Sequence, residues 1–379
     1  MNVRLSQDSP FAPRRLGQAV MLACLLGSSA TAFAGGTISL GDDKSISIGL
    51  GLKTSYTSTS NAAANSKDRS SDFNVDSARL YVNASLSKMV KLTFNTEKSS
   101  DDSVKVLDAF GSLQFMPEFN LDMGRTIIPS DRANLSGGYY LPAYTFAGVG
   151  SQAYSKFASR DDGAVVWGKL MGGKLVYSAG VFNGRNKDNV AKSNDTSSPL
   201  YAGRLAFNFW SPEPAPSYLT GSTYYGSADI LTLGVWGHSQ KNGVGSAAVK
   251  DDYSAWGSDI LLEKKLGVGV ITLEGGYSKY DWTTTAATAD GVINQPGKSM
   301  IAGAAFLIPK QVGWGKFQPF YRYQKFDPDG SSSNRKVNDY GVNYLIDGSN
   351  ARLTAQYRTD KTDNGPDTDS IILGMQLQY

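Results

Sequence analysis

The chain has 379 residues, of which 37 are basic and 34 acidic, so its formal net charge is only +3. This balance gives no bulk electrostatic reason to bind nucleic acid. One histidine and one cysteine exclude cysteine-clustered zinc sites, histidine-rich metal sites and disulfide scaffolds. Apolar residues reach 41% and are spread along the chain, which argues against disorder.

The first segment has the features of a secretory signal peptide. Two arginines precede an apolar run at residues 16–26, and Ala32-Phe33-Ala34 follows as a small-x-small cleavage site. We therefore expect residues 1–34 to be removed and residues 35–379 to form the mature protein. The alternative is a lipoprotein box ending at Cys24, but the apolar run continues past this cysteine.

The rest of the chain has no apolar stretch near the 18 residues that a membrane-spanning helix needs. Its segments instead alternate with a period of two. In residues 45–56, isoleucine and leucine occupy one parity, and serine, glycine and lysine the other. Because successive strand side chains point to opposite faces, each such segment has one apolar and one polar face. The pattern predicts sixteen strands, at 45–56, 73–86, 90–97, 104–115, 119–125, 163–170, 174–183, 200–209, 229–240, 253–264, 269–280, 299–308, 316–326, 337–346, 351–358 and 370–379.

The connections between these strands alternate in length. Tight turns are predicted at 87–89, 116–118, 171–173 and 347–350, and long polar loops at 57–72, 126–162, 184–199, 241–252, 281–298, 327–336 and 359–369. Short turns at one rim and long loops at the other are typical of an outer-membrane barrel, and aromatic residues near the strand ends match its interfacial girdles. The predicted fold is all-β, a 16-stranded antiparallel transmembrane β-barrel in a Gram-negative outer membrane.

Sixteen strands make a barrel wide enough to hold water. The loop at 126–162, after the fifth predicted strand, is much longer than ordinary connections, and loops of this length are usually functional or disordered. It contains six tyrosines and phenylalanines with which to pack. We expect it to fold inward and narrow the pore; the alternative is an external flap.

Charged residues of this loop and of the inward parity are the candidates for ion filtering. The predicted walls carry equal numbers of basic and acidic side chains, so their net charge predicts no strong preference for anions or cations. Each charge is either half of a structural ion pair or a contact for solute. The residues predicted to form the constriction and line the pore are Arg125, Asp131, Arg132, Lys156, Arg160, Arg79, Arg204, Arg322, Arg352 and Arg358.

One stretch carries a more specific signal, between Ala202 and Gln240. A strand ends in Asn208-Phe209-Trp210, a Pro-Glu-Pro linker follows, and Ser222-Thr223-Tyr224-Tyr225-Gly226 precedes the next strand. This run resembles the phosphate-selective porin O/P superfamily, including its short-chain amide porin relatives. The shorter motifs Ser77–Leu80 and Met123–Arg125 and the terminal Tyr379 add to the resemblance.

The resemblance implies a sixteen-stranded, trimeric, water-filled channel whose terminal aromatic, Tyr379, is read by barrel-assembly machinery. Phosphate-selective members rely on an arginine ladder and a lysine ring. The long loop here has no clear lysine cluster, which argues against phosphate specificity.

The function we expect is passive diffusion of small hydrophilic solutes, with a mild preference for anions or small amides left open. The alternatives are a phosphate- or anion-selective channel, and a barrel that serves as a sleeve or adhesin without an open pore. The expected partners are outer-membrane lipid, lipopolysaccharide and two further copies of the chain, with no nucleic acid. An enzyme is not expected, because catalysis would depend on the lone His238, and no cofactor or metal site is predicted.

Overall fold

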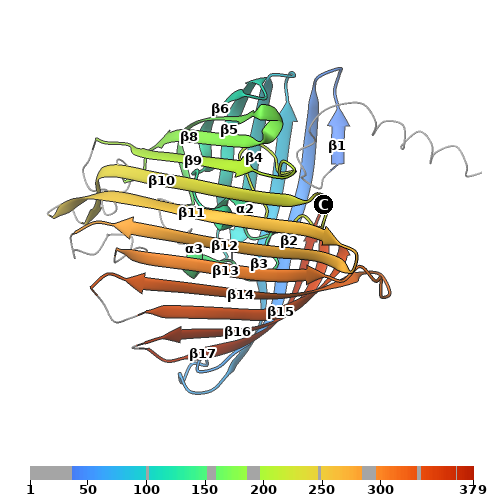
Figure 1. Ribbon diagram of the computed structural model, residues 1–379, viewed down its shortest axis with the longest axis vertical. Coiled ribbons are helices and arrows are strands. Elements are labelled where there is room, and N and C mark those ends of the chain that lie inside the picture. The colour runs from blue at the N-terminus through green and yellow to red at the C-terminus, as the bar shows by residue number, and fades with distance from the viewer. Residues whose placement is uncertain are drawn as a thin grey trace, which may run out of the picture.

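The computed structural model describes residues 36–99, 102–151, 159–185, 197–245, 249–283, 296–330, 334–363 and 365–379. Sixteen antiparallel strands, β2 to β17, follow one another around a single sheet, and the pairing of β9 with β10 and of β17 with β2 closes it (Figure 1). The predicted closed barrel of sixteen strands is confirmed.

All barrel strands except β8, which has eight residues, have at least the roughly nine residues that a tilted strand needs to cross a bilayer. Their bounds are β2 (Ser45–Thr59), β3 (Ser70–Ser85), β4 (Val90–Ser99), β5 (Val104–Met116), β6 (Phe119–Ile127), β7 (Arg160–Leu170), β8 (Leu175–Phe182), β9 (Leu200–Asn208), β10 (Ile230–Gly245), β11 (Lys250–Leu266), β12 (Gly269–Asp281), β13 (Gly297–Leu307), β14 (Lys316–Pro328), β15 (Arg335–Asp347), β16 (Ala351–Thr362) and β17 (Thr368–Gln378).

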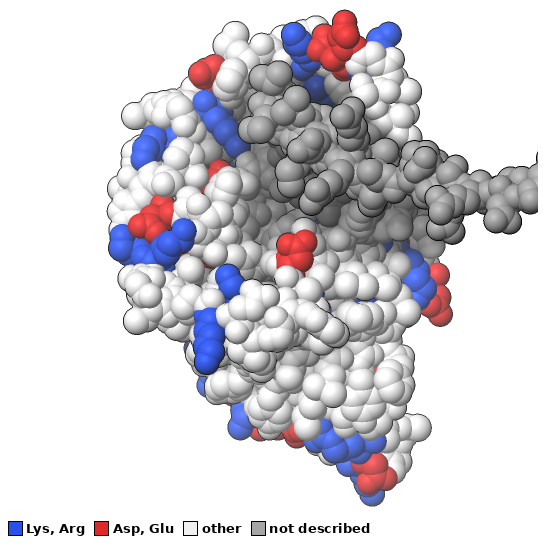
Figure 2. Space-filling view, turned by 90° about the vertical axis from the view of Figure 1, so that its right-hand side faces the viewer, with Lys and Arg blue, Asp and Glu red and all other residues white. Residues whose placement is uncertain are grey.

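The two-residue alternation separates the faces of the barrel as expected. On β2, Ile48 and Leu50 are 45% and 56% exposed on the outside, whereas Lys53 and Ser55 are buried on the inside. Such exposed aliphatic side chains recur on every part of the sheet and form the lipid-facing surface. On the face that Figure 2 shows, the charged side chains lie in small groups of both signs, mostly toward the margin, with uncharged surface between them.

Strand ends are the part of the barrel that differs from the sequence prediction. The β10–β11 hairpin continues through residues predicted as a loop, up to Gly245 and from Lys250. Beyond the membrane both faces of a strand meet water, so alternation disappears while the hydrogen-bonded ladder continues. None of the described helices is long and apolar enough to cross a membrane.

One strand lies outside the predicted set. The strand β1 (Gly36–Ser39) pairs antiparallel with Ser45–Ile48, the first part of β2. Its four residues are too few to display a period, so the sequence pattern gave no signal for it.

The two rims of the barrel carry different connections. Tight turns join β3 to β4, β5 to β6 and β15 to β16 at one rim, and the 3-10 helix η1 (Met171–Gly173) joins β7 to β8 there. The connection from β9 to β10, residues 209–229, is an exception to the predicted pattern, because it lies at this short-turn rim but is long.

Candidate pore constriction

The long loop that follows β6 lies inside the barrel, where its described part, residues 128–151, packs on the walls. It contains two short helices, α2 (Arg132–Ser136) and α3 (Gly148–Ser151). Ile128 and Ala147 are fully buried, and Leu141 is 2% exposed. A surface flap would leave such side chains in water, so these contacts hold the loop against the inner face of the sheet.

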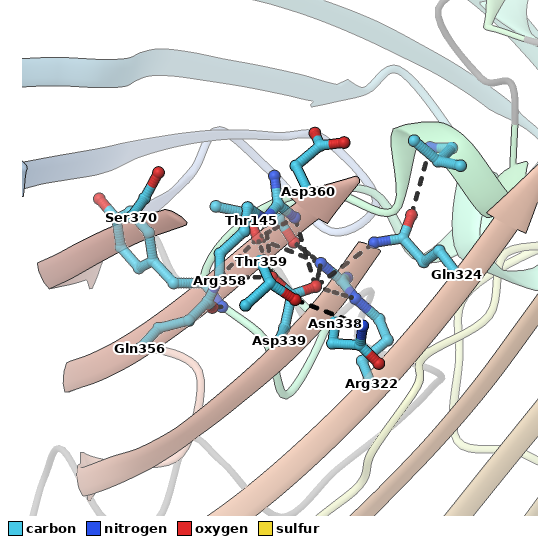
Figure 3. Close-up of polar contacts among 12 residues, drawn as sticks. Thr145, Arg322, Gln324, Asn338, Asp339, Gln356, Arg358, Thr359, Asp360 and Ser370 are labelled. Carbon is cyan, nitrogen blue, oxygen red and sulfur yellow. Dashed lines mark hydrogen bonds and ion pairs between the residues drawn. The ribbon is translucent and has the colours of Figure 1, made fainter. Parts of the chain in front are cut away.

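One group of wall residues forms hydrogen bonds with the middle of this loop (Figure 3). Asp339 on β15 accepts hydrogen bonds from Arg322 on β14 and Arg358 on β16, at 2.8 and 2.7 Å. Both arginines also donate to Thr145 of the loop, Arg322 to its carbonyl oxygen at 2.8 Å and Arg358 to its hydroxyl at 2.7 Å. The carboxylate thus orients two guanidinium groups toward the loop.

Two further cations bind loop carbonyls nearby. Arg352 on β16 donates from Nη1 to the Leu141 carbonyl oxygen at 2.6 Å. The Lys53 amine donates to the carbonyl oxygens of Gly138 and Tyr144, at 3.0 and 2.6 Å. Lys53 was not among the predicted site residues, although its place on the polar parity of 45–56 was the signal that it faces inward.

The start of the loop is held by a third group. Arg204 on β9 forms a bidentate pair with Asp259 on β11, at 2.5 and 2.7 Å, and donates to the Ser130 carbonyl oxygen at 3.0 Å. The backbone N–H of Arg132 donates to the same Asp259 carboxylate at 3.2 Å. His238 on β10 donates from Nε2 to the Pro129 carbonyl oxygen at 2.8 Å.

A second segment, residues 209–229, reaches the same place from the short-turn rim. Glu213 forms a bidentate pair with Arg132, both distances being 2.7 Å, and the two side chains are 8% and 1% exposed. Tyr224 donates to Glu213 at 2.6 Å, and Tyr218 donates to the Ile127 carbonyl oxygen at 2.8 Å. Although burial disfavours its charged form, the Arg132 guanidinium holds the pKa of Glu213 below its usual value.

Sequence reasoning assigned no role to this second segment. The signal was available in its length, which exceeds that of a tight turn, and in Tyr218 and Tyr224, aromatic residues with polar tips that suit a partly wet interior. What the sequence could not supply is that residues 128–151 and 209–229 enter from opposite rims and meet.

The other predicted site residues are divided between the lumen and the exterior. Arg79 pairs with Glu97 on the inner wall, and Arg160 pairs with Asp108, both at 2.8 Å. Asp131 is buried and caps α2 by accepting from the Asn134 N–H at 3.1 Å; it also accepts from the Ser151 hydroxyl.

Arg125 does not line the lumen: it shares the outward parity of β6 with Met123, which is 68% exposed, and pairs with Asp162 at 3.1 Å near the long-loop rim. The prediction grouped Arg125 with the inward loop because it lies one residue before Thr126, where that loop was predicted to begin. The strand β6 in fact continues to Ile127. Lys156 lies outside the described residues.

The inward-facing walls are covered unequally. Many inward side chains of β10 to β17 are fully buried, including those of Gln240, Glu263, Ser299, Gln318, Asp339, Arg352 and Gln376. On β3 and β4, by contrast, Asn83, Ser85, Lys91 and Thr93 are only half-buried. The side chains of the Arg79–Glu97 pair retain 14% and 18% exposure. The lumen that the loop leaves uncovered therefore borders β3 and β4.

Comparison with known proteins agrees with this architecture. A family model described as "Phosphate-selective porin O and P" matches residues 262–379, so the predicted resemblance is confirmed over this part of the chain. No curated protein sequence matches the chain.

Solved structures extend the likeness to the whole barrel. OmpF of Salmonella typhi in complex with daunomycin has a TM-score of 0.60 at 14% identity, and the alignment covers 91% of this chain and all of that one. OmpT of Vibrio cholerae gives 0.58 at 13% identity, covering 90% of this chain and all of the other. OprB of Pseudomonas putida at high pH gives 0.58 at 6%, covering 88% and 94%.

The chain is a porin-like β-barrel of the Gram-negative outer membrane. The match to a porin family model also supports the expectation that this porin-like barrel is not an enzyme. His238, the one candidate base, is buried and occupied by a loop carbonyl. In the described part of the chain, no group of three or more histidine, cysteine, aspartate or glutamate side chains is placed to hold a metal ion.

Proposed function

We propose that this barrel is a water-filled channel for the passive diffusion of small hydrophilic solutes, which pass between the long loop and the wall of β3 and β4. The observation that supports this most directly is the unequal covering of the lumen. The loop and the segment 209–229 bury the opposite wall, while polar side chains of β3 and β4 keep contact with open space.

The charges on the uncovered wall support weak rather than strong ion selectivity. Arg79 on this wall is neutralised by Glu97 at 2.8 Å, and Arg160 of β7 pairs with Asp108 at the same distance. Lys91 donates to the Ser85 hydroxyl at 2.7 Å and forms no ion pair with a carboxylate among the described residues. Solutes would be selected mainly by size, with a mild preference for anions.

A phosphate-selective channel is the second candidate, because the matching family model is described by that selectivity. Against this candidate, several arginines that could bind a passing phosphate are already bound to carboxylate or carbonyl groups of the protein. Arg322 and Arg358 are bound to Asp339 and to the loop, and Arg352 to a loop carbonyl. A guanidinium group in such contacts has few donors left for a passing anion.

We propose that residues 1–34 are removed on export, that the barrel is a homotrimer, and that Tyr379 is read during insertion. One similar solved structure, OmpT of Vibrio cholerae, is described as a trimer form. The C-terminal strand β17 closes the barrel by pairing with β2. Until that pairing forms, Tyr379 at its end would be exposed to the assembly machinery.

Single-channel recording in a planar bilayer, with a salt gradient to read the reversal potential, tests the proposed pathway. Glu97→Gln removes the carboxylate beside Arg79 and is expected to shift the reversal potential toward anion preference. Asp162→Asn is the matched control, since it removes one carboxylate from the outward pair with Arg125 and should leave the potential unchanged.

Three outcomes would contradict parts of this proposal. Equal shifts in the two variants would place the pathway elsewhere. A small, strongly anion-selective conductance that millimolar phosphate blocks would favour the phosphate channel. Folded protein without conductance would favour a sleeve or adhesin.

A further inference from the structure

Five lysines gather on one part of the outer surface, at the long-loop rim of five consecutive strands. We call Lys279, Lys298, Lys325, Lys336 and Lys361 the lysine belt; they lie near the long-loop ends of β12, β13, β14, β15 and β16. Each shares its parity with an exposed lipid-facing side chain of the same strand: Leu273, Met300, Tyr321, Tyr340 and Tyr357, in that order. The belt therefore faces outward.

The strand register brings these like charges together. Lys279 lies directly opposite Lys298, and Lys336 lies between Lys325 and Lys361 as the direct cross-strand partner of both. Side chains in such positions have Cβ atoms roughly 5 Å apart, and like charges there destabilise a sheet. A bound compensating anion would relieve the repulsion at these three contacts.

The protein supplies only part of that compensation. Lys325 pairs with Asp327 at 2.6 Å, Lys361 pairs with Asp367 at 3.4 Å, and Lys279 pairs with Asp329. Among the residues that the structure describes, no carboxylate lies within ion-pair distance of Lys298 or Lys336. Elsewhere on the rim the pattern differs, since outward Arg125 has its own carboxylate, Asp162.

The aromatic residues beside the belt set its level relative to the membrane. Tyr277 and Tyr323 each lie two residues before a belt lysine and on the same outward parity. Tyr321 packs against Tyr340 with ring centroids 5.0 Å apart, and Tyr357 is the cross-strand partner of Tyr340. Outward tyrosines mark the interface between hydrocarbon and headgroups. The lysines beyond them reach the level at which lipid phosphates lie.

From the register, the pairing and the level of these residues, we propose that the lysine belt binds the phosphate groups of an anionic lipid in the outer leaflet. Lys336, with a cation on each side, forms the centre of the site, and Lys298 extends it across β13. The tyrosines contact the upper part of the lipid. This site is separate from the pore, so it does not depend on which solute passes.

Thermal unfolding of the purified barrel in detergent, titrated with lipopolysaccharide, tests the proposal. Loss of two lysines near an anionic lipid surface is expected to weaken apparent binding roughly thirtyfold, so Lys298→Gln/Lys336→Gln should need that much more lipid for the same rise in Tm. Without lipid, this variant should unfold at the same or a higher temperature than the parent, because all three like-charge contacts are relieved.

Three controls separate the site from general charge effects. Lys88→Gln/Lys310→Gln makes the same charge change at the short-turn rim and should bind like the parent, and Lys298→Arg/Lys336→Arg should retain binding. Dephosphorylated lipopolysaccharide should give little rise in Tm. Undiminished binding by Lys298→Gln/Lys336→Gln, or equal binding of the dephosphorylated lipid, would overturn the proposal. An equal rise with inorganic phosphate at the same concentration would also overturn it, in favour of a free-phosphate site.

Discussion

Individual arginines in this barrel act mainly as anchors for backbone inside the lumen. A loop that enters a barrel leaves carbonyl groups without helix or sheet partners, and buried carbonyls need donors. A guanidinium group offers five donors in a planar fork, so one side chain can bind a wall carboxylate and a loop carbonyl together. Arg204 and Arg322 both do so.

The sequence could place these arginines on the inward face but not assign their role. Arg204, Arg322, Arg352 and Arg358 occupy positions that would suit a solute contact equally well. Whether a loop carbonyl or a solute meets such a side chain depends on the path of residues 128–151, which tertiary contacts determine. No pattern within the loop encodes that path.

The buried Arg132–Glu213 pair joins the start of the loop to the segment 209–229. Glu213→Gln would remove the bidentate partner of the buried Arg132 guanidinium and leave it the longer charged contact with Asp259, at 3.5 Å. Breaking a buried pair costs about 3–5 kcal/mol. We expect a lower Tm and noisier single-channel current, because the loop start is less firmly held. Asp229→Asn, which breaks the exposed pair with Lys264, is the control and should change neither. Unaltered stability in Glu213→Gln would show that this contact does not hold the loop.

Asp131 makes the stability of the loop depend on pH. Burial raises the pKa of this carboxyl to about 6, against hydrogen bonds from Asn134 and Ser151 that favour the charged form. The folded protein therefore holds this proton more tightly than the unfolded chain, and the contribution of Asp131 to stability falls as pH rises from about 4 to about 6. Between pH 5 and pH 7 the loss is about 1 kcal/mol. Chemical unfolding of the parent and of Asp131→Asn at both pH values measures it, and an identical pH dependence in the two proteins would contradict the assignment.

At the scale of elements, strands and loops differ in how far they could be predicted. Every barrel strand was located, because lipid outside and water inside impose alternation on each one. The helices α2 and α3 were not, since four or five residues carry no period and are set by contacts such as the Asp131 cap. The inward position of the segment 209–229 was not predicted either, because the residues that it contacts are distant in sequence.

The contact between the two inward segments can be tested by cross-linking. The hydroxyl oxygens of Ser136 in α2 and Thr220 in the segment 209–229 are 3.1 Å apart. Ser136→Cys/Thr220→Cys is therefore expected to form a disulfide under mild oxidation and to raise Tm, while mean conductance stays that of the reduced protein. The one native cysteine, Cys24, lies in the segment expected to be removed. Ser136→Cys/Ser60→Cys pairs the loop with a distant rim residue and should stay reduced. Failure of the first pair to cross-link would mean that the segments do not meet.

At the scale of the whole molecule, the barrel is a boundary between two solvents, and the cost of a charge depends on which one it faces. Leu205 on β9 is 51% exposed on the outside, opposite Val235 of β10. Leu205→Arg is expected to destabilise the barrel by about 2–4 kcal/mol in a lipid bilayer. Thr93→Arg on the lumen face of β4 should cost far less, because water reaches it. Equal losses, measured by unfolding in lipid vesicles, would contradict the assignment of the two faces.

The C-terminal Tyr379 lies beside β1, the first strand that the structure describes. β17 occupies one edge of β2 down to Gly51, and β1 continues along the same edge from Ile48 (Figure 1). The carbonyl oxygen of Tyr379 accepts from the Leu50 N–H at 2.7 Å, so Gly36 begins where Tyr379 ends. Gly36, the first residue that the structure describes, and the C-terminal residue are thus adjacent along one seam. A short linker could join them, and a circular permutant opened in an exposed long loop would preserve every strand pairing of the ring.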